Sequence, residues 1–130
     1  MTTLLLVDDD ETSRKLMGTG LARLGYTVIM AVNAKEGIDA ACAESPNLIL
    51  MDLRLPGMDG FEAAKRLKAD SKTAHIPIVA VSALKTAEDV QRAFRAGCDS
   101  FQTKPVNLPS LHVKIHSLVS RGAVRSPAAS

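Results

Sequence analysis

Residues 4–10 read LLLVDDD, an apolar run that stops abruptly at three aspartates. Three further predicted strands stop in a similar way: 48–51 before Asp52, 78–81 before Ser82 and 100–103 before Lys104. In an open parallel sheet, ligands bind in the crevice beyond the carboxyl ends of the strands. The pattern therefore gathers carboxylates, a hydroxyl and an ammonium at one edge of a sheet.

Predicted strands alternate with helical patterns along the chain. The strands are predicted at residues 4–7, 26–31, 48–51, 78–81 and 100–103. Helices are predicted from Glu11 to Leu24, from Asn33 to Ala43, from Asp59 onward, from Thr86 to Ala96 and from Asn107 onward. Repeated strand–helix units place helices on both faces of a parallel sheet. The sequence therefore predicts an α/β fold with one doubly wound, five-stranded sheet.

Capping signals and apolar spacing set the expected helix boundaries and faces. Asn33 with Glu36, and Asp59 with Glu62, have the spacing of a capping box. Apolar residues three or four positions apart are expected to face the sheet. They are Met17, Leu21 and Leu24 in the first helix, Phe61, Ala64 and Leu67 in the third, Val90, Ala93 and Phe94 in the fourth, and Leu111, Ile115 and Leu118 in the last.

Composition narrows the classes of function. A chain of 130 residues that is 46% apolar, with a net charge of +2, predicts one domain with a real core and no nucleic-acid partner. Cys42 and Cys98 lack a CxxC spacing and are interpreted as reduced, structural thiols. No signal peptide or membrane-length run is visible, so we expect a cytoplasmic protein without membrane contact. Residues 1–120 are predicted to form the domain, and residues 121–130 a disordered tail.

Three acids are expected to converge on one spot. Asp8 and Asp9 follow the first strand and Asp52 follows the third. Carboxylates so close together raise one another's pKa unless they share a proton or bind a cation. An all-oxygen ligand set on an open strand edge favours Mg²⁺, with Mn²⁺ as an alternative. The simpler alternative, that Asp8 and Asp9 only cap the first helix, leaves Asp52 unexplained.

Asp52 is also a candidate phosphoryl acceptor. An aspartate carboxylate can form an acyl phosphate, and the transfer needs a divalent ion and a further cation or hydroxyl near the phosphoryl oxygens. Lys104 would supply the cation and Ser82 the hydroxyl. Taken singly, Ser82 is more often a turn residue and Lys104 a solvated lysine than a functional group. Their joint occurrence at strand ends carries the specificity.

These residues together resemble the response-regulator receiver domain of bacterial two-component signalling, over Thr3 to Val119. The resemblance is to single-domain regulators of the chemotaxis or cell-division type. The matching motifs are LLLVDDD at 4–10, MDLRLPGMDG at 51–60, Val81-Ser82-Ala83 and Lys104-Pro105. The family implies a flavodoxin-like strand order, 2-1-3-4-5.

The resemblance also implies how the site works. Asp52 would be phosphorylated by a histidine kinase or a histidine phosphotransfer protein. Mg²⁺ would be held directly by Asp9 and Asp52, through water by Asp8, and by the backbone carbonyl of Arg54. The Lys104–Pro105 peptide would be cis, which fixes the direction of the ammonium. The protein would catalyse only its own phosphoryl transfer and dephosphorylation.

The family further implies a switch. Ser82 would bond the phosphoryl group, and Phe101 would rotate into the space that Ser82 vacates. Ala83 would keep the pocket open to a donor, and Arg54 and Leu84 would tune the lifetime of the phosphoryl group. The remodelled surface would comprise the fourth helix, fifth strand and fifth helix. Its apolar and basic residues would be Arg92, Arg95, Ala96, Phe101 and His112.

Other interpretations stay open at this point. A small Mg²⁺-dependent phosphohydrolase of the haloacid-dehalogenase type would need an acid two residues after its nucleophile, where this chain has Arg54. A degenerate receiver acting as a scaffold is disfavoured by the intact acids, Ser82 and Lys104. The chain could also be a receiver fragment of a hybrid histidine kinase, although the opening Met favours a full chain. The downstream protein target is unknown, and a monomer or weak dimer is expected.

Overall fold

The computed structural model describes residues 2–83 and 86–129, with side chains as far as residue 120. The strands are β1 (Thr3–Val7), β2 (Thr27–Ala31), β3 (Leu48–Asp52), β4 (Ile78–Ser82) and β5 (Ser100–Thr103). The helices are α1 (Glu11–Arg23), α2 (Ala34–Glu44), α3 (Gly60–Ala69), α4 (Ala87–Arg95) and α5 (Leu108–Ala129). The strands form one parallel sheet in the order β2-β1-β3-β4-β5. The predicted fold class and strand order are confirmed.

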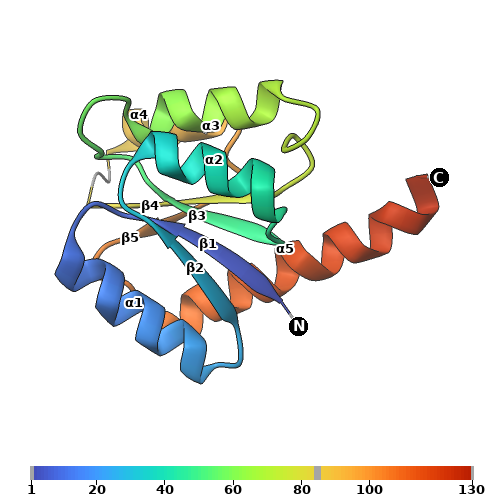
Figure 1. Cartoon of the computed structure of the whole chain (residues 1–130), viewed down its shortest axis with the longest axis horizontal. Helices are drawn as coiled ribbons and strands as arrows, with labels where there is room; N and C mark the ends of the chain where they lie inside the picture. Colours follow the sequence, from blue (N-terminus) through green and yellow to red (C-terminus); the bar gives the residue numbers. More distant parts are fainter. Residues whose placement is uncertain (1, 84–85, 130) are drawn as a thin grey trace.

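Helices cover both faces of the sheet, so the molecule has three layers (Figure 1). Helices α1 and α5 pack on one face, and α2, α3 and α4 pack on the other. Along β1, Leu4 and Leu6 belong to the first of these cores, whereas Leu5 and Val7 belong to the second. Alternate side chains of a strand point to opposite faces, which explains why a strand buried on both sides is apolar throughout.

Side chains at the helix starts satisfy free backbone amides. Asp10, Asn33, Asp59 and Thr86 each accept a hydrogen bond from the amide three residues later, at 2.8–3.1 Å. Such caps replace hydrogen bonds that the first turn of a helix cannot make internally. Asp10 is therefore the residue that caps α1, so capping does not account for Asp8 and Asp9.

Two residues expected to face the sheet point outward instead. Leu24 is 44% exposed and Phe94 is 48% exposed. Leu24 lies beyond the last residue of α1, where the helical spacing no longer fixes its direction. Phe94 follows the fully buried Ala93, and one residue turns about 100° around a helix. The inward prediction for these two residues was wrong, whereas Met17, Leu21, Phe61, Ala64, Leu67, Ala93, Leu111 and Ile115 are buried as predicted.

Helix α5 is longer than the sequence indicated. It is assigned as far as Ala129, and the disorder predicted for residues 121–130 stays a prediction. A division between domain and tail at residue 120 stays a prediction.

The outer edge of β5 carries a polar contact from α5. The Lys114 Nζ donates to the backbone carbonyl of Phe101 at 2.7 Å and to the Gln102 Oε1 at 2.9 Å. Because β5 is the last strand of the sheet, the Phe101 carbonyl has no neighbouring strand on that side. Lys114 thus takes the place that a further strand would occupy.

Two further observations complete the fold. Cys98 is buried, Cys42 is half-buried, and both are free thiols. In the part of the chain that the structure describes, no helix is both long enough and apolar enough to cross a bilayer.

Candidate functional site

The carboxyl ends of β1 and β3 bring three acids together. Asp8 and Asp9 follow β1, and Asp52 ends the neighbouring strand β3, where Val7 pairs with Met51. One carboxylate oxygen from each of the three acids lies within 4.8 Å of the others. Asp8 is 1% exposed and Asp52 6%, whereas Asp9 is open to solvent. The predicted acid cluster is present, with one side accessible.

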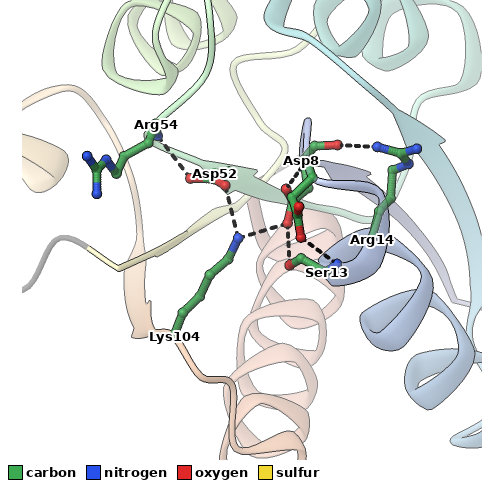
Figure 2. Close-up of polar contacts among 7 residues, drawn as sticks. Asp8, Ser13, Arg14, Asp52, Arg54 and Lys104 are labelled. Carbon is green, nitrogen blue, oxygen red and sulfur yellow. Dashed lines mark hydrogen bonds and ion pairs between the residues drawn. The ribbon is translucent and has the colours of Figure 1, made fainter.

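Lys104 bridges two of these acids. Its Nζ donates to the Asp8 Oδ2 at 2.9 Å and to the Asp52 Oδ2 at 3.0 Å, as Figure 2 shows. The lysine follows β5, and its peptide bond to Pro105 is cis, as predicted. Burial alone would lower the pKa of Lys104, but hydrogen bonds to the two carboxylates outweigh burial and raise it. The ammonium group of Lys104 is thus fixed between Asp8 and Asp52.

Three donors hold the Asp8 carboxylate. The Oδ1 accepts from the backbone amide of Asp10 at 2.9 Å. The Oδ2 accepts from the Ser13 hydroxyl at 2.7 Å and from Lys104 (Figure 2). Burial favours the protonated acid, but these donors outweigh burial and place the pKa of Asp8 below its ordinary value. The Arg14 guanidinium also donates to the backbone carbonyl of Asp8, at 2.9 Å. Asp8 is therefore a fixed anion.

Asp52 lies in a less compensated position. Its Oδ1 accepts from the backbone amide of Arg54 at 2.9 Å, and its Oδ2 accepts from Lys104. Burial raises the pKa of Asp52, the neighbouring charge of Asp8 adds to the increase, and the two hydrogen bonds only partly offset it. A bound cation would relieve this unfavourable charge, so the donor set fits a divalent ion that prefers oxygen ligands. The arrangement offers carboxylate oxygens on one side and an ammonium on the other.

The start of α3 packs directly against the end of β3. The Gly60 amide donates to the Leu53 carbonyl at 3.1 Å. A Cβ atom at Gly60 would lie 2.2 Å from the Asp52 carbonyl oxygen and 2.6 Å from the Leu53 Cα. Only glycine allows this approach. Gly60 therefore fixes the backbone that carries the Asp52 carboxylate.

The remaining predicted residues take different positions. Ser82 is buried at the end of β4, and its carbonyl accepts from the Lys104 amide at 3.0 Å. Ala83 is exposed, and Phe101 is half-buried against the core under α2, α3 and α4. The Arg54 side chain is exposed and points away from the acids (Figure 2). Leu84 lies outside the described residues.

Two residues predicted for the switching surface do not contribute to it. One is buried, and the other faces away from α4. Ala96 is 3% exposed, so it offers no contact area. The His112 Nδ1 lies 2.8 Å from the Tyr26 hydroxyl, so this ring faces the start of β2 rather than α4. Phe94 on α4 and Val113 on α5 are exposed apolar side chains that were not predicted to belong to this surface.

Sequence reasoning missed the residues of α1 that support the site. Ser13 and Arg14 both bond Asp8, yet neither belonged to a recognised motif. The signal was the spacing of Asp10 and Ser13, which is that of a cap and the third residue of a helix. That spacing places the Ser13 side chain in the first turn, which faces the acids.

Comparison with known proteins agrees with this geometry. The family model of the response regulator receiver domain matches residues 4–116. The polar-differentiation response regulator DivK of Brucella anthropi is 36% identical over 107 residues, which cover 82% of this chain and 87% of DivK. The DNA-binding dual master transcriptional regulator RpaA of Synechocystis sp. is 35% identical over 121 residues. That match covers 93% of this chain and 50% of RpaA, so the chain spans about half the length of this relative.

A solved structure shares the fold. The receiver domain of the sensor histidine kinase PA1611 from Pseudomonas aeruginosa PAO1 superposes with a TM-score of 0.86 at 26% identity. The alignment covers 92% of this chain and 98% of that domain, whose structure holds a magnesium ion in its active-site cleft. The resemblance inferred from the sequence motifs is confirmed. The chain belongs to the response regulator receiver domain family of two-component signalling.

Proposed function

We propose that Asp52 is the phosphoryl acceptor of this receiver domain. The observation that carries the proposal is the position of the Lys104 Nζ, which lies 3.0 Å from Asp52 and 2.9 Å from Asp8, two members of a cluster of three carboxylates. Phosphoryl transfer depends on positioning and on neutralising the charge of the phosphoryl oxygens. A fixed ammonium and a cation site beside one carboxylate meet both requirements.

A divalent ion completes the proposed site. Asp9 and Asp52 would bind Mg²⁺ directly, Asp8 would bind through water, and the Arg54 backbone carbonyl would add a ligand. Oxygen donors and an open side suit Mg²⁺, which keeps several waters, and Mn²⁺ accepts similar ligands. The magnesium ion of the PA1611 receiver domain supports this assignment. When bound, the ion would neutralise charge on the transferring phosphoryl oxygens.

The proposed donor is a phosphohistidine of a histidine kinase or a histidine phosphotransfer protein. An Asp52 carboxylate oxygen attacks the phosphorus, and the phosphorus–nitrogen bond to the imidazole breaks. The leaving imidazole takes a proton from water, and the product is an aspartyl phosphate. Lys104 then pairs with the phosphoryl oxygens. The chain would catalyse only this transfer and the later hydrolysis, with Arg54 and Leu84 tuning the lifetime and Ala83 leaving access for the donor.

The phosphoryl group would act on the surface of α4, β5 and α5. It adds a charge of about −1.5 to −2 and three acceptor oxygens, which would draw the Ser82 hydroxyl and let Phe101 move inward. Phe94 and Val113 lie exposed on α4 and α5, so an output partner with an apolar patch suits this face. The partner would be a protein, and the receiver would be a monomer or weak dimer. We propose a cytoplasmic location for the receiver, because histidine kinases use ATP there to phosphorylate their own histidines.

The test is direct phosphorylation. Incubation with Mg²⁺ and phosphoramidate or acetyl phosphate should add about 80 Da, the mass of one phosphoryl group, to the intact protein. Asp52→Asn should show no adduct, whereas Asp39→Asn, at an exposed aspartate of α2, should be modified like the wild type. An adduct that persists in Asp52→Asn, or turnover of added phosphomonoesters without an adduct, would overturn the proposal.

A further inference from the structure

Ser13 lies outside the sequence motifs quoted above, yet it contacts one of the site acids. Its hydroxyl donates to the Asp8 Oδ2 at 2.7 Å, and its backbone amide donates to the capping carboxylate of Asp10 at 2.8 Å. The hydroxyl and the backbone amide of Ser13 are thus both bonded to acids that precede α1. A side chain held in this way has one favoured rotamer, so the hydroxyl is aimed at Asp8 before any ligand arrives.

The second donor to the same oxygen is shared. The Lys104 Nζ contacts the Asp8 Oδ2 at 2.9 Å and also the Asp52 Oδ2 at 3.0 Å. If Asp52 carries a phosphoryl group, as proposed above, the ammonium has a new partner with about twice the negative charge of a carboxylate. Lys104 is therefore a donor that Asp8 can lose during the reaction.

Without Lys104, the Asp8 carboxylate would depend on its remaining donors. Asp8 is only 1% exposed, and a buried carboxylate that lacks donors is strongly disfavoured. Ser13 and the Asp10 amide bond opposite oxygens of this carboxylate, so together they fix the plane of the group. The Ser13 hydroxyl carries no charge and does not compete with Lys104 for the phosphoryl oxygens.

We propose that Ser13 is a positioning residue that keeps the Asp8 carboxylate turned toward the cation site, whether or not Lys104 contacts it. The inference rests on the proposed function, because it assigns Ser13 a part in holding the divalent ion. Partners behind metal-binding side chains commonly contribute about tenfold or more to metal affinity. Ser13→Ala should therefore bind Mg²⁺ about tenfold more weakly than the wild type, while remaining folded.

The experiment is a titration of the unphosphorylated protein with Mg²⁺ by calorimetry, repeated with Mn²⁺ by electron paramagnetic resonance. Ser13→Thr keeps a hydroxyl and should stay within about threefold of the wild type. Thr12→Ala removes the neighbouring, solvent-exposed hydroxyl of α1 and should leave the affinity unchanged. Circular dichroism of each variant checks that the domain is folded at the temperature of the titration.

A double-mutant cycle tests whether Ser13 affects Mg²⁺ affinity through Asp8. If the hydroxyl acts through Asp8, Ser13→Ala in an Asp8→Asn background should cost less than about twofold in affinity. Equal binding by Ser13→Ala and the wild type would overturn the inference, as would equal losses in Ser13→Ala and Ser13→Thr, or an undiminished loss in the Asp8→Asn background. Absence of Mg²⁺ binding by the wild type would instead refute the proposed function, and the inference with it.

Discussion

Gly60 gives the sharpest test of how the fold positions Asp52, the proposed phosphoryl acceptor. Replacing it with alanine would put a Cβ atom 2.2 Å from the Asp52 carbonyl oxygen and 2.6 Å from the Leu53 Cα. Both neighbours are backbone atoms of a buried strand end, so neither can turn aside. Because these backbone atoms cannot move, the cost should lie at the upper end of the overpacking range, about 3 kcal/mol, and alanine recovers at most about 1 kcal/mol through its helix propensity. We expect Gly60→Ala to lose about 2 kcal/mol of unfolding free energy.

The matched control is Gly18→Ala in the middle of α1. Its Cβ would lie 2.3 Å from the Met30 Cε, but that atom is the end of a flexible side chain that is 46% exposed. The methionine can rotate away, so the gain in helix propensity, about 1 kcal/mol, should offset the contact. Gly18→Ala should therefore be as stable as the wild type within about 1 kcal/mol.

Urea unfolding followed by circular dichroism measures both variants. With a typical slope of about 2 kcal/mol per molar, the midpoint of Gly60→Ala should fall by about 1 M. Its Mg²⁺ affinity should fall too, because the displaced backbone carries the Asp52 carboxylate. Gly60→Ala with wild-type stability, or Gly18→Ala with the larger loss, would refute the reasoning from backbone contact.

Two other sites lead to measurable expectations. Burial, with the nearby charge of Asp99, raises the pKa of the Cys98 thiol to about 12. Below that value its thiolate fraction falls about tenfold per pH unit. In the native protein at pH near 8, iodoacetamide should therefore modify Cys42 and leave Cys98 intact, as mass mapping would show. Rapid labelling of Cys98 in native Cys42→Ser would contradict this. The Arg92 guanidinium lies 3.9 Å from the centre of the Phe61 ring, so Arg92→Ala should cost about 0.5–1 kcal/mol in urea unfolding. An unchanged midpoint would show that this stacking is energetically neutral.

The sequence predicted most of the fold because its local signals agree with one another. Asn33 and Asp59 cap the helices that their spacing indicated, and the apolar runs at residues 4–7 and 48–51 became strands buried on both faces. Predictions went wrong at positions where spacing has little control. Leu24 lies past a helix end, and Phe94 sits at the margin of an apolar stripe whose centre is Ala93.

The candidate site was predicted from strand ends, which the topology of a parallel sheet brings together. Asp8, Asp52 and Lys104 are far apart in the chain, yet each directly ends or follows a strand, and the structure brings them within hydrogen-bonding distance. Ser13 was missed because its role depends on the rotation of α1 about its own axis. Hydrophobic spacing fixes which side of a helix is apolar, but it does not show which polar side chain reaches a particular carboxylate.

The contact from Lys114 to the Phe101 carbonyl bears on how the molecule meets others. An unpaired strand at the rim of a sheet invites main-chain association with a second chain, and a lysine there is a common safeguard. Any chain that added itself to β5 would have to displace an ammonium already bonded to that carbonyl. This contact disfavours self-association into continuous sheets. A protein that binds the outer edge of β5 must therefore contact side chains rather than backbone.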